Sequence, residues 1–269
     1  MTEDPKRPTL LREQSLRTRL RDKTPLFGLF CELPCPEVIE IAGIAGWDFV
    51  LIDCEHAPIS DTSLPPLLRA AAAAGIPAMV RVASNEPSAI QHVLDAGPAG
   101  LQIPQVSSVE AARAAISASR FHPLGRRGLN PFVRAADFSD CPTPAFLASS
   151  NQQILSLQIE SVDGIQALPE ILRLGNFDVL FVGPYDLSQS LGIPGDVTNP
   201  RVFEAGARIA AATADHDVVL GVFVNAEPEA RRWLDAGVRY LCYSVDTVLL
   251  LKALKSTVSR LRELAPPAV

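Results

Sequence analysis

Short, nearly continuous apolar runs alternate along the chain with longer amphipathic stretches. Eight runs have the length and composition of buried strands: Leu26–Phe30, Phe49–Asp53, Ala78–Val82, Gly100–Pro104, Ile154–Glu160, Val179–Gly183, Val218–Val224 and Tyr240–Val245. Between them, apolar residues recur with helical spacing, as in Glu37–Ala45, Ser63–Ala74, Pro87–Ala96, Val109–Ser119, Asn199–Asp215 and Glu227–Ala236. Apolar strands that alternate with helices are typical of a parallel sheet covered by helices.

Eight such units in 269 residues predict an α/β fold built as a single (β/α)₈ TIM barrel. An open, doubly wound sheet is the competing architecture. Leu10–Asp22 places Leu16 and Leu20 four residues apart, which predicts an extra N-terminal helix that caps the bottom of the barrel. We therefore divide the chain into an N-terminal extension with this capping helix, residues 1–24, and a barrel domain, residues 25–269.

Two segments exceed what one barrel requires. Phe121–Ser150 is rich in Pro, Gly and Arg and is too long for an ordinary connection, so we interpret it as part of a subunit interface. The final helix, which starts near Asp246, carries a wide apolar stripe made of Val248, Leu249, Leu250, Leu251, Leu254, Val258 and Leu261. We expect this helix to pack on another subunit of a homo-oligomer.

Composition excludes several classes of protein. With 24 basic and 30 acidic residues the formal charge is −6, which argues against nucleic acid as a partner. No apolar run is long enough to span a membrane, and no apolar signal core follows the N-terminal arginines, so we expect a cytoplasmic protein without membrane contact. The five cysteines are odd in number and form no CxxC pair, which argues against a disulfide framework and against a structural zinc site.

Lysine usage bears on the chemistry. The four lysines, Lys6, Lys23, Lys252 and Lys255, lie near the chain ends, and none is on a predicted core strand. Schiff-base chemistry requires a desolvated lysine amine inside the site. The sequence offers no obvious candidate for it.

Polar residues close several of the apolar runs. In a parallel barrel, catalytic groups project from the C-terminal ends of the strands. Here those positions hold Asp53, Glu55, His56, Arg81, Gln158, Glu160 and Asp186. Arg81 alone cannot neutralise the carboxylates, so a divalent cation is the economical solution, and oxygen ligands without clustered His or Cys suit Mg²⁺ or Mn²⁺.

Each candidate also has a structural interpretation. Glu160 and Asp186 are the preferred metal ligands because they close successive strands, although Glu160 alone is compatible with a salt bridge and Asp186 with a helix cap. His56 is the candidate general acid or base, or else a loop histidine bound to backbone. Asp95 is a candidate to orient it, or an ordinary acid at a helix end. Arg81 at a strand end is typical of an anion site.

Several segments together resemble the HpcH/HpaI aldolase family. The resemblance runs from about Gly28 to the last helix, and it is carried by the segments 43–58, Val80–Val82, Leu157–Glu160, Phe181–Ser188 and Ser244–Thr247. It implies a (β/α)₈ barrel and a class II, divalent-metal-dependent aldolase that cleaves or forms 4-hydroxy-2-keto acids through a metal-bound pyruvate enolate plus an aldehyde. The 4-hydroxy-2-oxoheptanedioate and 2-keto-3-deoxy-sugar acid aldolases are of this type. Family members are commonly hexamers that exchange the eighth helix between subunits.

The resemblance also implies roles for individual residues. Glu160 and Asp186 would bind the metal, which is Mg²⁺ or Mn²⁺ with Co²⁺ as a further candidate. Arg81 would stabilise the oxyanion at C2, and His56, made more basic by Asp95, would move the proton. The substrate-binding group would comprise Gln158, the backbone around Gly183 and Tyr185, Asp186, and Asp53, which holds waters around the metal.

Three aromatic residues depart from the family pattern: Phe30, Tyr185 and Phe223. They do not affect the pyruvate half of the pocket, but they leave the identity of the aldehyde substrate undetermined. A semialdehyde, a sugar-derived aldehyde and an aromatic aldehyde are the alternatives. Two other functions compete with the aldolase. One is an acyl-CoA thioester lyase of the citrate lyase β or malyl-CoA lyase type, which needs a basic surface for the CoA phosphates. The other is a non-catalytic barrel subunit.

Overall fold

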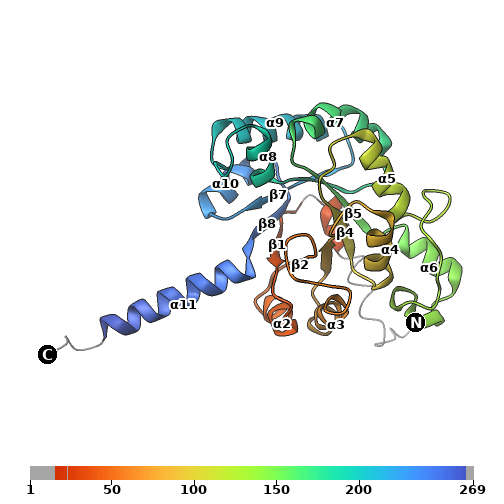
Figure 1. The fold of residues 1–269 in the computed structure, drawn as a ribbon, viewed down its shortest axis with the longest axis horizontal. Coiled ribbons are helices and arrows are strands. Elements are labelled where there is room, and N and C mark those ends of the chain that lie inside the picture. The colour runs from red at the N-terminus through yellow and green to blue at the C-terminus, as the bar shows by residue number, and fades with distance from the viewer. Residues whose placement is uncertain (1–15, 23, 265–269) are drawn as a thin grey trace.

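The computed structural model describes residues 16–22 and 24–264, and its centre is a closed barrel of eight parallel strands (Figure 1). The strands are β1 (Leu26–Cys31), β2 (Phe49–Asp53), β3 (Ala78–Arg81), β4 (Gly100–Ile103), β5 (Ile154–Ile159), β6 (Val179–Val182), β7 (Val219–Val224) and β8 (Tyr240–Val245). Strand β1 pairs with both β2 and β8, which closes the sheet. The predicted barrel is therefore confirmed, and the open sheet is excluded.

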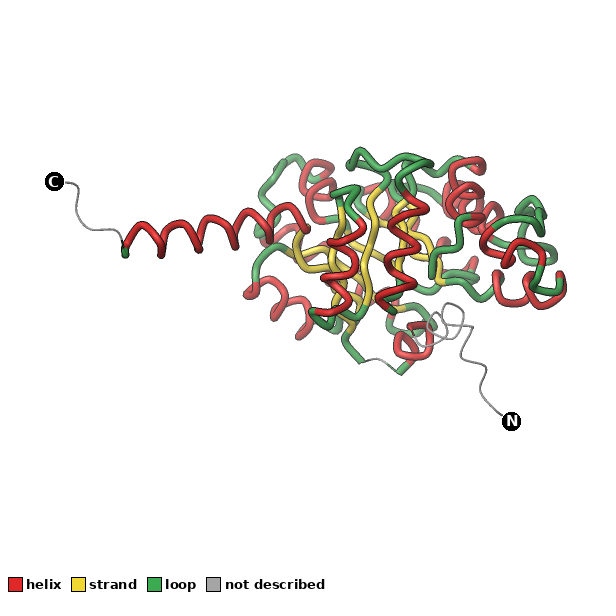
Figure 2. Tube along the Cα trace, turned by 90° about the horizontal axis from the view of Figure 1, so that it is seen from below, coloured by secondary structure: helices red, strands yellow, loops and turns green. Residues whose placement is uncertain are grey.

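Helices surround the strands, as Figure 2 shows from a second direction. They are α2 (Pro36–Ile44), α3 (Leu64–Ala74), α4 (Pro87–Asp95), α5 (Val109–Ser119), α6 (Thr143–Ser150), α7 (Val162–Leu174), α8 (Pro184–Ser190), α9 (Pro200–Thr213), α10 (Glu227–Asp235) and α11 (Asp246–Glu263), with a 3₁₀ segment η1 (Arg134–Ser139). Local sequence starts several of them. The Ser108 and Ser161 hydroxyls, for example, accept the first-turn N–H groups of α5 and α7, each at 3.1 Å.

The apolar residues form two main layers. One layer fills the space between strands and helices and includes Ile52, Val80 and Leu157. The other fills the barrel interior, where Phe49 and Tyr240 stack with ring centroids 4.3 Å apart. Gly28 faces that interior, and a Cβ at this position would collide with the Phe49 ring. Side chains therefore pack the barrel up to its C-terminal mouth, where the polar residues begin.

A short helix before β1 closes the opposite end of the barrel. Residues 16–21 are helical, and Leu16 and Leu20 are buried among the interior residues. Arg17 Nη2 contacts Asp178 Oδ1 at 2.7 Å, just before β6. The remainder of the predicted helix, residues 10–15, lies outside the described residues.

The long connection after α5 folds into a small unit of its own. It contains η1 and α6, and Phe121, Ala136 and Phe146 form a separate apolar cluster within it. The Arg127 guanidinium lies over the Phe121 ring, 4.5 Å from its centroid, and ties the unit to the end of α4 through Asp95. Its role as a subunit interface stays a prediction.

The last helix, α11, leaves the body of the barrel and projects away from it (Figures 1 and 2). Every residue from 250 to 264 is exposed. The apolar members of this exposed surface are Leu250, Leu251, Leu254, Val258, Leu261 and Leu264. Of the predicted stripe, Val248 and Leu249 are half-buried against the barrel, and the members from Leu250 onward are uncovered by it. Among the described residues, no helix has both the length and the apolar character needed to cross a membrane.

Candidate active site

A layer of polar side chains crosses the C-terminal mouth of the barrel on neighbouring strands. Asp53 is the register partner of Arg81, and Arg81 is the register partner of Gln102. Asp53, Arg81, Gln102 and Gln158 are all buried. The Gln102 amide donates to Gln158 Oε1 at 2.7 Å. Strand register therefore brings together side chains that are far apart in sequence.

Arg81 is held by three carboxylate oxygens. Its Nε and Nη2 donate to the two oxygens of Asp53 at 2.8 and 2.7 Å, and its Nη1 lies 3.1 Å from Glu55 Oε2. Burial by itself would lower the pKa of Arg81, but the bonds to Asp53 and the charges of Asp53 and Glu55 raise it. The guanidinium therefore stays charged while fixed, 5.0 Å from the centroid of the Phe30 ring. Of its five N–H bonds, two remain for a ligand.

Glu160 is a buried carboxylate beside a second acid. Its Oε1 accepts the Gln105 backbone N–H at 2.7 Å, and its Oε2 accepts the Gln158 amide. Burial raises the pKa of Glu160 to about 7, helped by the charges of Asp186 and Glu55 and opposed by these hydrogen bonds. Asp186 stands in the first turn of α8, at the exposed side of the same site. In the described part of the chain, no ion pair joins either acid to a basic side chain.

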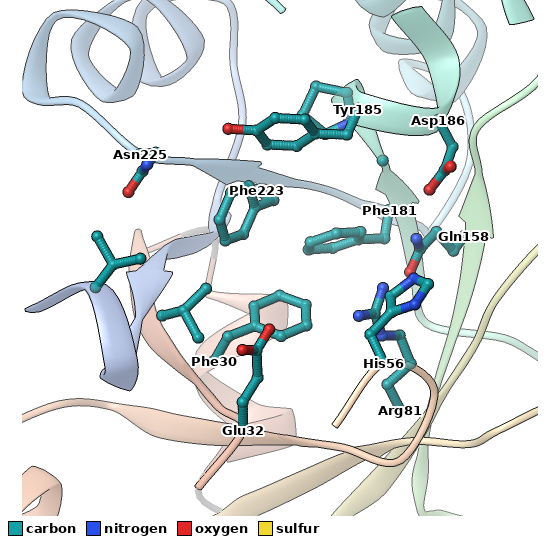
Figure 3. A pocket seen from close by; sticks show the side chains of 14 residues that line it. Phe30, Glu32, His56, Arg81, Gln158, Phe181, Tyr185, Asp186, Phe223 and Asn225 are labelled. Atoms are coloured by element: carbon teal, nitrogen blue, oxygen red, sulfur yellow. The ribbon is translucent and has the colours of Figure 1, made fainter. Parts of the chain in front are cut away.

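Three of these residues, Arg81, Gln158 and Asp186, border a cavity of about 290 Å³ at the mouth (Figure 3). Asp186, Gln158, Arg81 and His56 lie along one side of it, and Phe30, Phe223 and Asn225 lie on the other. The full lining is Phe30, Glu32, His56, Arg81, Gln158, Phe181, Gly183, Pro184, Tyr185, Asp186, Phe223, Asn225, Val245 and Val248.

The acidic pair suits a divalent cation. The charge of Asp186 raises the pKa of Glu160, and neither acid forms an ion pair with a basic side chain among the described residues, so a hard cation between them would be favourable. Within residues 16–22 and 24–264, no cluster of three or more His, Cys, Asp or Glu side chains is placed to hold a metal ion. The protein would thus supply two oxygen ligands and leave the other coordination positions to water and substrate, as is usual for Mg²⁺.

The amino-acid sequence matches a known family. The model of the HpcH/HpaI aldolase/citrate lyase family matches residues 26–253. The chain belongs to the HpcH/HpaI aldolase/citrate lyase family.

Individual HpcH/HpaI relatives are similar over nearly the whole chain. A hydroxypyruvate/pyruvate aldolase of Paraburkholderia phytofirmans is 35% identical over 254 residues, covering 92% of this chain and 97% of the relative. A 4-hydroxy-2-oxo-heptane-1,7-dioate aldolase of Escherichia coli is 32% identical, covering 92% and 95%. The crystal structure of a family member from Burkholderia cenocepacia superposes with a TM-score of 0.87 at 36% identity, covering 92% and 99%.

In this HpcH/HpaI protein the candidate base has a different neighbour from the predicted one. His56 is exposed, and its Nε2 lies 3.7 Å from Glu55 Oε2. The carboxylate of Asp95 accepts a hydrogen bond from Arg127 Nη2 at 2.8 Å instead. Asp95 ends α4, which leads into the start of β4, so it lies at the opposite rim from the cavity. Within one chain, His56 therefore lies near Glu55 and not near Asp95, and the role of Asp95 in orienting His56 stays a prediction.

Gly183 allows the close approach of the metal-ligand candidate. A Cβ at this position would meet Glu160 Oε2 and would lie 3.0 Å from Gln158 Nε2. The Gly183 N–H donates to the Ile159 carbonyl at 3.4 Å, whereas the Tyr185 N–H belongs to the first turn of α8, which has no intrahelical acceptor. Of the two predicted carboxylate-binding amides, Tyr185 is thus the one left for a ligand.

The structure adds residues that the sequence analysis missed. Glu32 follows β1 and Asn225 follows β7, and both line the cavity of this HpcH/HpaI protein. Gln105, with a φ of 57°, binds Glu160 through its N–H and Glu55 through its side chain at 2.9 Å. The rule that polar residues after strands mark the site, applied to β1 and β7, would have found Glu32 and Asn225.

Proposed function

We propose that this chain is a class II pyruvate aldolase that cleaves or forms 4-hydroxy-2-keto acids with the help of a divalent cation, Mg²⁺ or Mn²⁺. The observation that carries the proposal is the pair of acids Glu160 and Asp186. The charge of Asp186 raises the pKa of Glu160, neither acid has an ion-pair partner among the described residues, and the cavity beside them also contains the fixed guanidinium of Arg81. The aldolase names of the relatives support it.

Glu160 and Asp186 would hold the cation, which when bound would supply Lewis-acid withdrawal of electrons from the keto acid. Arg81 would direct its two remaining N–H bonds at the C2 oxygen, where negative charge develops. Because Asp53 and Glu55 already fix the guanidinium, it needs no reorganisation when that charge appears. Gln158 and the Tyr185 amide would orient the carboxylate end of the substrate.

His56 would handle the proton. In the cleavage direction, it takes the proton of the 4-hydroxyl, directly or through water, as the C3–C4 bond breaks. The C4 carbon leaves as an aldehyde, and the electron pair of the broken bond passes to C3. A proton returned to C3 completes pyruvate. No oxidant or second substrate is consumed.

Nucleophilic alternatives find no support in the described residues. Lys252 and Lys255 lie on the exposed part of α11, and the two other lysines, Lys6 and Lys23, fall outside the described ranges. Burial raises the pKa of the Cys54 thiol to about 12, so it is a poor nucleophile. An acyl-CoA lyase would need basic side chains for the CoA phosphates, and the cavity lining offers Arg81 and His56 alone.

The proposal predicts exchange of the pyruvate methyl protons for deuterium without any aldehyde present. We expect proton NMR to show loss of the methyl signal with Mg²⁺ or Mn²⁺, no loss after removal of metal with a chelator, and recovery on adding either metal back. Glu170→Gln, a change of an exposed acid on α7, is the matched control and should exchange like the wild type. Exchange that persists in the metal-free protein would contradict the proposal.

We also propose that the protein is a homo-oligomer in which α11 packs on a neighbouring copy. Its exposed apolar stripe supports this arrangement. The double substitution Leu251→Glu and Leu254→Glu should lower the mass measured by sedimentation velocity, because it charges that stripe. Lys255→Glu, on the same helix, is the control and should leave the mass unchanged. A wild-type monomer at micromolar concentration would refute the arrangement.

A further inference from the structure

One part of the cavity, lined by Phe30, Phe223 and Glu32, has no role in the proposed binding of the keto acid, and we call it the aldehyde half. Phe30 and Phe223 meet edge to face with ring centroids 5.4 Å apart, and Phe30 and Phe181 lie 6.4 Å apart. Tyr185 extends this wall, 6.0 Å from Phe223. Figure 3 shows Phe30 and Phe223 across from Gln158 and His56, with Phe181 between the two sides. An aldehyde that reacts with the bound keto acid would have to lie along this aromatic wall.

A single carboxylate, that of Glu32, borders this half of the cavity. Its backbone N–H donates to both oxygens of Asp246 at 3.1 and 3.2 Å, and the next N–H, of Leu33, donates to Asp246 Oδ2 at 3.1 Å. Asp246 is only 5% exposed, so it fixes the backbone from which Glu32 projects. The backbone that carries Glu32 is therefore fixed at the cavity, which the Glu32 side chain lines.

Few positive charges offset Glu32. The basic residues of the cavity lining are Arg81, already bound to two carboxylates, and the exposed His56. No ion pair of Glu32 is present among the described residues. Burial raises the pKa of Glu32, and the charges of Asp53 and Asp246 raise it further, against Arg81 and His56. The aldehyde half is thus a region of negative potential, unfavourable to a second carboxylate.

The polar group facing this region from β7 is an amide. The Ser244 hydroxyl donates to Asn225 Oδ1 at 2.6 Å, which leaves the Nδ2 donors of Asn225 to the cavity that it lines. An amide and a carboxylate on an aromatic wall together bind hydroxyl groups well. They provide no counter-ion for an anion.

We propose that Glu32 determines the aldehyde specificity: the site accepts uncharged, hydroxylated aldehydes and discriminates against aldehydes that carry a carboxylate. Glu32 accepts a hydrogen bond from a hydroxyl of the aldehyde, and the aromatic wall holds its carbon chain. The inference rests on the proposed aldolase function and names the substrate class of the same site.

The inference separates this chain from one of its relatives. Cleavage of 4-hydroxy-2-oxo-heptane-1,7-dioate between C3 and C4, the substrate in the name of the Escherichia coli relative, releases a four-carbon aldehyde that ends in a carboxylate. Such an aldehyde would place its negative charge near Glu32 in the present chain. Family membership alone therefore does not fix the aldehyde.

The test compares aldehydes of equal chain length, with pyruvate as the partner. Butanal and succinic semialdehyde differ in having a methyl group or a carboxylate at the far end. We expect the wild type to prefer butanal in kcat/KM by about tenfold or more, because like charges repel across the cavity. Propanal and glyceraldehyde differ only in hydroxyl groups, and we expect glyceraldehyde to be preferred.

Substitutions at Glu32 should change these ratios. Glu32→Gln should raise the ratio of kcat/KM for succinic semialdehyde over butanal by about tenfold, and Glu32→Lys should raise it further. Glu32→Ala should lower the preference for glyceraldehyde over propanal. Glu40→Gln, an exposed acid on α2, is the control and should leave both ratios unchanged.

Pyruvate methyl exchange distinguishes the two proposals, since it requires no aldehyde. If the wild type exchanges the methyl protons but the Glu32 variants keep its aldehyde ratios, the specificity inference is overturned and the aldolase proposal stands. If the wild type shows no exchange with either metal, both fall. A wild-type preference for succinic semialdehyde over butanal would also overturn the inference.

Discussion

Replacing Glu160 by Gln should reduce pyruvate methyl exchange on the order of 10³-fold, because several kcal/mol of Lewis-acid stabilisation are lost with the cation. Glutamine has nearly the same shape, and its amide oxygen can accept one of the two hydrogen bonds that Gln105 and Gln158 donate to Glu160. The loss should therefore reflect the missing charge and not a disturbed barrel. Isothermal titration with Mn²⁺ should show a matching loss of affinity.

The same substitution should stabilise the metal-free protein. Burial raises the pKa of Glu160 from 4.5 to about 7, so the folded protein keeps a proton that the unfolded chain releases. As the pH rises from 4.5 to about 7, the metal-free wild type loses stability relative to Glu160→Gln, and above that pH the difference is constant. The difference in free energy of unfolding between the two proteins should approach about 3 kcal/mol, at 1.36 kcal/mol per pKa unit.

Urea denaturation with chelator present, repeated over this pH range, measures the difference. Mg²⁺ should restore the stability of the wild type above neutral pH but leave Glu160→Gln unaffected. Glu170→Gln serves again as the control. Equal stability of wild type and Glu160→Gln at every pH would show that Glu160 is not held as an uncompensated acid.

Replacing Arg81 by Met should cost about 3–5 kcal/mol of unfolding free energy and also abolish exchange. Asp53 is fully buried and receives two hydrogen bonds from Arg81, so the substitution leaves its charge without a partner inside the barrel. Loss of exchange follows separately, because Arg81 is the cationic side chain proposed to face the C2 oxygen.

A double-substitution cycle separates the two effects. Adding Asp53→Asn to Arg81→Met removes the unpaired charge and should recover much of the lost stability, although exchange should stay absent. Arg81→Lys keeps the charge but cannot make the bidentate contact with Asp53. Its free energy of unfolding and its rate of pyruvate methyl exchange should lie between those of the wild type and of Arg81→Met. If the double variant lost the sum of the two single losses, Asp53 and Arg81 would not act as a pair.

The sequence was sufficient for the fold because barrel strands are recognisable locally. Each of the eight strands is a short apolar run with its own flanking signals, and its partner is the next run along the chain. Helix α7 was not among the helical stretches that we singled out, and Gly164 and Pro169 interrupt its pattern. The folding of the 121–150 connection against α4 depends on contacts such as Arg127 with Asp95, which spacing does not reveal.

The site was predictable only for residues found by one rule, that polar residues at the C-terminal ends of barrel strands mark the site. Polar residues at the C-terminal ends of strands identified Asp53, Arg81, Gln158 and Glu160, which the structure places at one mouth. Within a single chain Asp95 does not contact His56, because a residue at the C-terminal end of a helix lies on the other rim, and its role in orienting His56 stays a prediction. In a (β/α)₈ barrel the strands and helices run in opposite directions, so the C-terminal end of a helix lies at the rim opposite to the C-terminal end of a strand. A residue can be assigned to a rim only when this direction is taken into account.

The contact between Asp246 and the Glu32 backbone joins residues 214 positions apart. It forms only when β8, the last strand, pairs with β1, the first. During synthesis, a chain that has emerged from the ribosome only as far as β7 lacks β8, the strand that closes the barrel. It also lacks the Asp246 carboxylate, which holds the backbone at Glu32. Activity should accordingly appear late in synthesis, and a premature stop before Asp246 should yield a protein without a functional aldehyde site.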